Sequence, residues 1–186
     1  MGLYEPTNEY RDFNITVSTG NGGEDLLKKY IVHKGFQVIN RANDPIYRAK
    51  DIDFEFSRNG KKWHSVEVKS DSRMAQTGNI VIEVAMYRRN GRSPGWLYYC
   101  EADYLCFIDM QSYKFYFFDW KKLQQLVLSG RWRFTKFNNG TDNCEGELCK
   151  ISVRELRELG LIVVEDKIYF GNRNVFLSLN WIVFIL

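Results

Sequence analysis

The sequence predicts an α/β fold in which helices flank a mixed central sheet. Apolar residues recur at helical spacing in segments 24–34 and 120–128. Short runs rich in Val, Ile, Phe and Tyr lie between these two segments and are typical of strands. The chain has 186 residues, of which 45% are hydrophobic, and this is enough for one compact core with a small C-terminal α+β extension.

The expected elements divide the chain into three parts. Residues 1–20 form an N-terminal lead-in, residues 21–130 form the core, and residues 131–186 form an extension packed on that core. The first helix of the core ends at Gly35, which is a natural helix stop. Elsewhere we expect strands at 36–40, 52–57, 62–69, 79–86, 102–108 and 113–118, a polar loop at 71–78, a helix at 152–160 and a hairpin over 161–170.

A hairpin between the second and third strands carries the most informative residues. Asn59-Gly60 is a strong turn signal between the two runs. Side chains alternate along a strand, so Glu67 and Lys69 share one face while their valine neighbours face a core. Asp53 lies on the face opposite Phe54. Pairing the two strands therefore brings Asp53 and Glu67 together, with Lys69 beside them.

Two alternatives accompany this interpretation. Acidic and basic side chains on an amphipathic hairpin commonly form a solvated face with modest cross-strand pairing. The run Asp51-Ile52-Asp53 also holds two acids, so Asp51 competes with Asp53 for any role at the site. We favour Asp53 because of its spacing to Glu67.

The order of these features resembles the PD-(D/E)xK nuclease superfamily over about residues 22–120. An acidic helix start precedes an Asp-bearing strand, an Asn-Gly turn and an apolar strand that ends in Glu67-Val68-Lys69. The chain departs from the pattern in having no proline before Asp53. The resemblance, closest to resolvase-like or phage-associated members, implies a restriction-endonuclease-like core. It also implies a magnesium-dependent nuclease that hydrolyses phosphodiester bonds, with DNA as the expected substrate.

The resemblance also implies a role for each site residue. Asp53, one oxygen of Glu67 and the Val68 carbonyl would ligate Mg²⁺, and Mn²⁺ would substitute because it accepts the same ligands. Lys69 would orient the attacking water and stabilise the transition state. Glu24, on the same side of its helix as the core-facing residues, would reach the metal. The alternative for Glu24 is that it only offsets the positive end of the helix.

Basic and polar residues beyond Lys69 are candidates for nucleic-acid binding. The net charge of +3 permits such binding but does not argue for it. Arg88, Arg89 and Arg92 form a basic turn that suits phosphate contacts. The likeness of segment 77–104 to a phage-associated branch implies that Asn79, Glu83 and Ser93 border the site. An equally weighted alternative for Glu83 is an ordinary solvent-facing acid.

Partners and location follow from simpler features. The polar N-terminal segment lacks a secretory signal, and the four cysteines form no Cys-x-x-Cys pair, which together predict a cytoplasmic protein of a bacterial or phage-infected cell. The apolar segment 179–186 is too short to span a bilayer, so we expect no membrane partner. The same segment could pack against a second copy of the chain, so a homo-oligomer stays an alternative. A second function class also stays open: a catalytically inactive nucleic-acid-binding or assembly protein on a nuclease fold.

Overall fold

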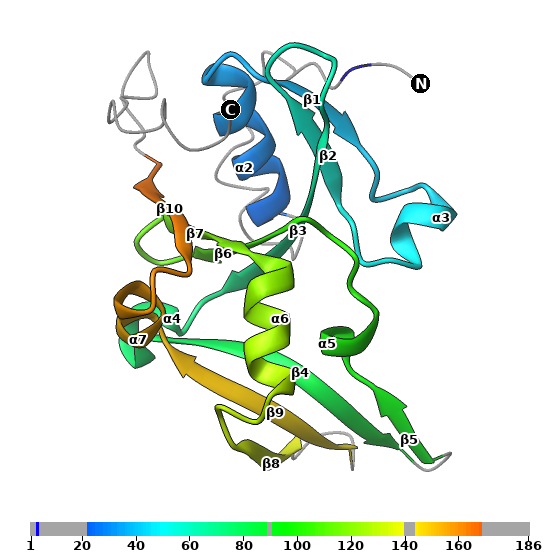
Figure 1. The fold of residues 1–186 in the computed structure, drawn as a ribbon, viewed down its shortest axis with the longest axis vertical. Coiled ribbons are helices and arrows are strands. Elements are labelled where there is room, and N and C mark those ends of the chain that lie inside the picture. Colours follow the sequence, from blue (N-terminus) through cyan, green and yellow to red (C-terminus); the bar gives the residue numbers. More distant parts are fainter. Residues whose placement is uncertain (1–2, 4–21, 89–90, 140–143, 169–186) are drawn as a thin grey trace.

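A six-stranded mixed sheet forms the centre of the molecule, so the expected α/β class is confirmed (Figure 1). The computed structural model describes residue 3 and residues 22–88, 91–139 and 144–168. The lead-in over 1–20 and the apolar segment 179–186 lie outside these described residues. The strands of the central sheet lie in the order β1 (Gln37–Asn40), β2 (Phe54–Ser57), β3 (His64–Asp71), β6 (Tyr104–Asp109), β7 (Lys114–Asp119) and β10 (Ile162–Lys167).

The middle of this sheet combines both kinds of strand pairing. Strands β3 and β6 are parallel, whereas β1–β2, β2–β3, β6–β7 and β7–β10 are antiparallel. A parallel pair needs a long crossover connection. Here the connection from β3 to β6 contains two strands of a second sheet, so the chain leaves the central sheet and returns to it.

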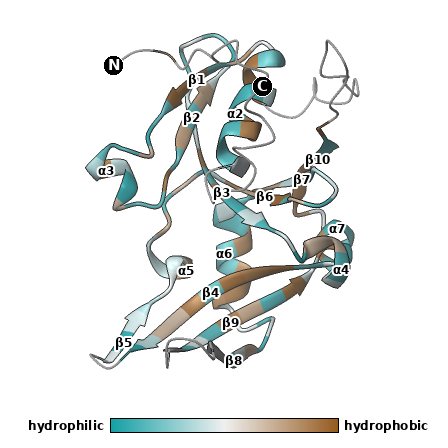
Figure 2. Cartoon of the chain, turned by 180° about the vertical axis from the view of Figure 1, so that it is seen from behind, coloured by the Kyte–Doolittle hydropathy of each residue, from teal (hydrophilic) through white to brown (hydrophobic). Residues whose placement is uncertain are grey.

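The second sheet has four strands and was not anticipated from the sequence. Its order is β5 (Gly91–Pro94), β4 (Asn79–Arg88), β9 (Cys144–Ser152) and β8 (Phe134–Asn139). Figure 2 shows the hydrophobic stretch along β4, whose Ile80, Ile82 and Val84 are fully buried. The sequence identified β4 as a strand, but it could not show which strands it would pair with.

The central sheet is covered on both faces. Helix α2 (Gly22–His33) covers one face and packs with Val66, Val68 and neighbouring aromatic residues. Helix α6 (Trp120–Leu128) and the second sheet cover the other face, where Leu105 and Phe107 of β6 are buried. Successive residues of β6 thus enter opposite cores, as strand alternation requires.

Four short helices complete the described part of the chain: α3 (Pro45–Arg48), α4 (Met74–Thr77), α5 (Trp96–Tyr99) and α7 (Val153–Glu158). Helix α4 replaces the polar loop that was predicted over 71–78, and its only buried residue is Met74. One turn with one apolar contact is too short to produce a periodic signal.

The C-terminal part of the chain contributes strands to both sheets. Strand β9 pairs with β4, and β10 pairs with β7 at the edge of the central sheet. The hairpin predicted over 161–170 is wrong for the described residues, because Ile162–Lys167 forms one strand that pairs with β7 instead. Among the described residues, no helix combines the length and apolar character needed to cross a membrane.

Candidate active site

Strands β2 and β3 bring Asp53 and Glu67 to facing positions. Phe54 pairs with Val66, and the Asp53 backbone N–H donates to the Val66 carbonyl at 2.9 Å. The backbone ladder between the two strands ends here. The Asp53 side chain makes the next contact with β3, because its Oδ2 accepts a hydrogen bond from the Val68 backbone N–H at 2.8 Å. The predicted hairpin therefore places Asp53 beside Glu67.

Lys69 lies on the same face of β3 as Glu67. Its ammonium pairs with the Glu67 carboxylate and lies 3.1 Å from Oδ2 of Asp51. The Trp96 ring completes this environment, with its centre 5.0 Å from the Lys69 nitrogen. Glu67 is only 4% exposed, so water screens its charge weakly, whereas Lys69 and Asp51 remain partly exposed.

Burial and crowding perturb the two facing acids. Burial, and next the charge of Asp53, raises the pKa of Glu67, although Lys69 opposes this shift. Burial also raises the pKa of Asp53, while the hydrogen bond from Val68 and the charge of Lys69 act in the other direction. Burial alone would lower the pKa of Lys69, but its two carboxylate partners outweigh burial and raise it. Perturbed titration of this kind clusters at functional sites.

Glu24 reaches the same region from the start of α2. The helix approaches β3 closely because residue 23 is glycine: a Cβ there would lie 2.0 Å from Oγ of Ser70. The Glu24 carboxylate pairs with Lys28 at 3.6 Å. Burial, followed by the charge of Asp53, raises the pKa of Glu24. The helix thus delivers an acid within electrostatic reach of Asp53, while the role of Glu24 as a ligand stays a prediction.

The second sheet contributes Glu83, which sequence reasoning could not separate from a solvent-facing acid. The pairing of β4 with β9 shifts register between Glu83 and Ala85, which marks a bulge. Bulges re-aim side chains and occur often beside active sites. Burial raises the pKa of Glu83, and the charges of Lys69 and Asp51 also act on it. Glu83 therefore lies close enough to influence the cluster on β3.

Helix α5 supplies two side chains that sequence reasoning did not assign to the site. Gly95 sits against β4, where a Cβ would lie 2.3 Å from the Glu83 carbonyl oxygen. This close approach places Trp96 beside Lys69, and it places Tyr99 within electrostatic reach of Asp51 and Glu83. Burial, and then the charge of Asp51, raises the pKa of Tyr99. The local signal is a glycine before a short run rich in aromatic residues, Trp96-Leu97-Tyr98-Tyr99, and it is weak.

The oxygen donors at the site fit a divalent cation chemically. Carboxylates are the ligands that Mg²⁺ prefers, and a cation would relieve the repulsion between Asp53 and Glu67. Among the described residues, no group of three or more His, Cys, Asp or Glu side chains is arranged to hold a metal ion. The Val68 backbone N–H contacts Asp53, and a role for the Val68 carbonyl as ligand stays a prediction.

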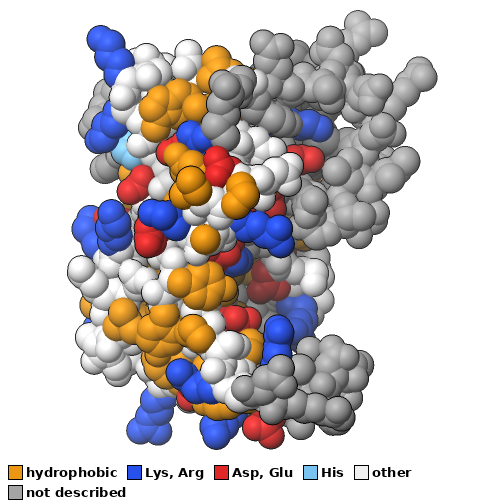
Figure 3. Space-filling view, turned by 90° about the vertical axis from the view of Figure 1, so that its right-hand side faces the viewer, with side chains coloured by type: hydrophobic (Ala, Val, Ile, Leu, Met, Phe, Trp, Pro, Cys, Tyr) orange, Lys and Arg blue, Asp and Glu red, His pale blue; other side chains and the backbone are white. Residues whose placement is uncertain are grey.

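The basic residues predicted to bind nucleic acid lie mostly at one end of the second sheet. Arg88 ends β4, and Arg92 and Ser93 are exposed on β5, whereas Arg89 lies outside the described residues. Asn79 begins β4, so the strand separates it from Arg88 by about 30 Å. Figure 3, which views the molecule from the right-hand side of Figure 1, shows Lys and Arg side chains bordering Asp and Glu side chains.

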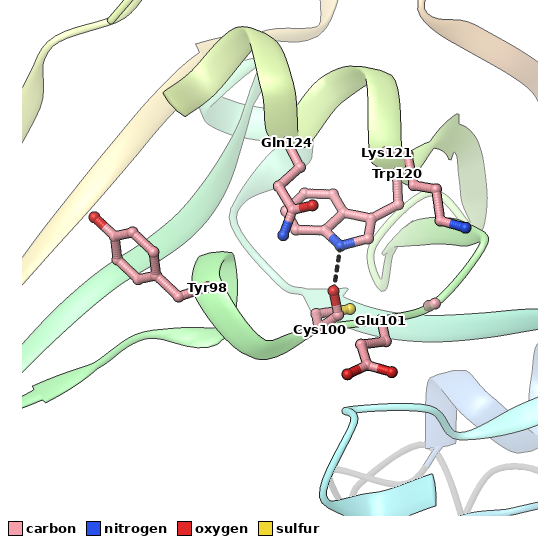
Figure 4. Close-up of a pocket in the computed structure, with 7 residues that line it drawn as sticks. Tyr98, Cys100, Glu101, Trp120, Lys121 and Gln124 are labelled. Atoms are coloured by element: carbon pink, nitrogen blue, oxygen red, sulfur yellow. Dashed lines mark hydrogen bonds between the residues drawn. The ribbon is translucent and has the colours of Figure 1, made fainter. Parts of the chain in front are cut away.

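A shallow pocket of about 310 Å³ lies behind α5, between this helix and α6 (Figure 4). The indole N–H of Trp120 donates to the Cys100 carbonyl at 2.9 Å, and the Gln124 amide donates to the Leu97 carbonyl at 2.7 Å. These bonds tie α5 to α6. The hydrogen bonds around the pocket help to hold the segment that carries Trp96. The pocket itself is not the candidate site, because neither Asp53 nor Glu67 lines it.

Comparisons with known proteins give one structural likeness. No family model and no curated protein matches the sequence. Among solved structures, the chain is similar to a bacterial homing endonuclease, I-Ssp6803I, with 17% identity and a TM-score of 0.48. The match covers 77% of this chain and 85% of the other.

Proposed function

We propose that the protein is a metal-dependent nuclease that hydrolyses phosphodiester bonds, with DNA as the expected substrate and Mg²⁺ as the expected cofactor. One observation carries the proposal: Asp53 faces the buried Glu67, and Lys69 pairs with Glu67 on the same face of β3. A buried acid that faces a second, half-buried acid and pairs with an amine is costly to maintain without a task. Hydrolysis of a phosphodiester requires such charges because the phosphate is anionic and resists attack by water.

Each residue has a distinct part in the proposed reaction. Asp53 and Glu67 would hold the metal through their oxygens, and Glu24 would complete the site from α2. A bound divalent cation would neutralise the phosphate and lower the pKa of its water. Lys69 would orient that water with its ammonium and stabilise the charge that develops on the phosphate. The basic turn formed by Arg88, Arg89 and Arg92 would hold phosphates further along the nucleic acid.

A cleavage panel tests the proposal directly. Purified protein would be incubated with Mg²⁺, Mn²⁺ or EDTA and with labelled linear, circular and four-way-junction DNA, and with RNA of matched length. We expect cleavage that requires metal and is absent in the Lys69→Ala variant. A wild-type protein that cleaves none of these substrates with either metal overturns the proposal. Binding without cleavage would instead support the inactive nucleic-acid-binding class.

A further inference from the structure

Asp51 adopts an unusual backbone conformation next to the candidate site. Its φ of 54° lies in the left-handed region, which only Asp51 and Tyr113 occupy among the described non-glycine residues. This conformation costs about 1–2 kcal/mol for most L-residues, and Asp and Asn tolerate it best. Strained residues of this kind persist when their surroundings hold them firmly, and they concentrate at functional sites.

Contacts from both sides hold the Asp51 turn in place. The Glu101 backbone N–H donates to the Lys50 carbonyl at 2.9 Å, and the side chains of these two residues pair at 2.6 Å. The Cys100 thiol lies 3.6 Å from the Asp51 carbonyl oxygen. The turn before β2 is therefore fastened to the segment that follows α5.

The consequence of this turn is a carboxylate aimed at Lys69. The Asp51 Oδ2 atom lies 3.1 Å from the Lys69 nitrogen, on which Glu67 and the Trp96 ring also converge. Two acids and a ring around one ammonium restrict where its nitrogen can lie. Asp53, rather than Asp51, contacts the Val68 backbone N–H. The two acids of the Asp51-Ile52-Asp53 run thus face different partners.

We propose that Asp51 is a positioning residue that, together with the Trp96 ring, fixes the Lys69 ammonium, and that Asp51 is not a metal ligand. The catalytic part of this inference rests on the proposed nuclease function. The contact itself does not, because it can be measured without any substrate. An ammonium on a flexible four-carbon stem needs such support if it is to orient a water molecule.

The Asp51→Asn variant tests the proposal because asparagine keeps the size of the side chain and tolerates the left-handed conformation. We expect kcat for nucleic-acid cleavage to fall about tenfold, which corresponds to about 1.4 kcal/mol. KM and the Mg²⁺ dissociation constant measured by calorimetry should change less than about twofold, since a twofold change is only about 0.4 kcal/mol. Lys69 should also react faster with an amine-specific acylating reagent, measured by peptide mass spectrometry.

A second variant separates positioning from a purely structural role. Asp51→Gly relieves the left-handed backbone but loses the ion pair with Lys69, so its melting temperature should stay close to that of the wild type. Its Lys69 labelling and its kcat should nevertheless follow those of Asp51→Asn. Trp96→Phe is the matched ring control, and it should preserve slow labelling because a ring remains over the ammonium.

The outcomes keep the two proposals distinguishable. Wild-type Lys69 labelling rates in Asp51→Asn overturn the positioning role, whether or not the protein cleaves nucleic acid. Faster labelling with an unchanged kcat overturns its catalytic importance. Loss of Mg²⁺ binding in Asp51→Asn makes Asp51 a ligand and overturns the assignment. A wild-type protein that cleaves nothing defeats the nuclease proposal, while the labelling result still decides the contact.

Discussion

The two faces of β3 show how one strand divides stability from chemistry. The face toward α2 presents Val66 and Val68 to a closed core of aliphatic and aromatic side chains. The face toward β4 presents Glu67 and Lys69, which pair with each other, and Lys69 also pairs with Asp51. Both faces are largely buried, yet only one is apolar. Changes on the first face should therefore lower stability, and changes on the second should lower activity.

The largest expected effect lies on the apolar side. Phe56 is fully buried against α2, and Phe56→Ala removes a ring from this core. We expect a loss of about 3–5 kcal/mol in the free energy of unfolding. Urea unfolding measures this loss, and the kcat of the fraction that remains folded should stay near the wild-type value. A low kcat in fully folded protein would break the separation between the two faces.

Lys69→Ala should give the largest effect on the charged side. The ammonium acts on the water and on the transition state, so we expect cleavage to fall about a hundredfold or more. Metal binding and folding should remain close to wild type, as measured by calorimetry and thermal unfolding. Cleavage at the wild-type rate would show that the site has been assigned wrongly.

Asp53→Asn should abolish binding of the divalent metal and leave the protein folded. The carboxylate faces Glu67, so its loss halves the facing pair of acidic donors, and Mg²⁺ depends on such oxygens. We expect calorimetry to detect no Mg²⁺ binding at concentrations that saturate the wild type. Asp51→Asn is the matched control, and a variant pair with the reverse pattern would move the ligand to Asp51.

Glu24→Gln distinguishes a site residue from a helix-end charge. If Glu24 completes the metal site, turnover should fall by about tenfold, or about 1.4 kcal/mol, without a lower melting temperature. If it only offsets the helix dipole, stability should fall by about 0.3–1 kcal/mol and turnover should persist. Turnover and thermal unfolding of one purified variant decide between these signatures.

The smallest effect concerns the pH dependence of stability in EDTA. Burial, and then Asp53, raises the pKa of Glu67 above its ordinary value of 4.5. The folded state therefore keeps a proton that the unfolded state releases, and the free energy of unfolding falls as pH rises above about 4.5. Glu67→Gln should flatten this slope. Parallel slopes for the two proteins in urea titrations would show that Glu67 titrates normally.

Sequence patterns predicted the juxtaposition of Asp53 and Glu67, because local rules determine it. Alternation and the Asn59-Gly60 turn were sufficient to pair Asp53 with Glu67, because hairpin register depends on neighbouring residues. The bulge beside Glu83 and the positive φ of Asp51 carry no comparable signal. Both depend on contacts with segments far along the chain.

The same distinction explains the errors in the predicted fold. The strand at 162–167 was recognised as extended, but its partner was taken to be its neighbour in sequence. Strand β7 lies far from this strand along the chain, so no local sequence signal reports the pairing. The short helix α4 was missed because one turn has too few residues for periodicity.

The route of the chain between β3 and β6 couples the site to the completion of folding. Four residues are proposed to act at the cleaved phosphate, and all of them precede residue 70: Glu24, Asp53, Glu67 and Lys69. Strand β3, however, gains its parallel neighbour only when β6 at Tyr104–Asp109 is in place. The intervening segment carries Glu83 and Trp96 into the second sheet and α5 before it returns. Non-local pairing of this kind forms late because it must first close a long loop. A chain that ends before β6 would therefore hold these acids and the lysine without the geometry that the proposed reaction requires.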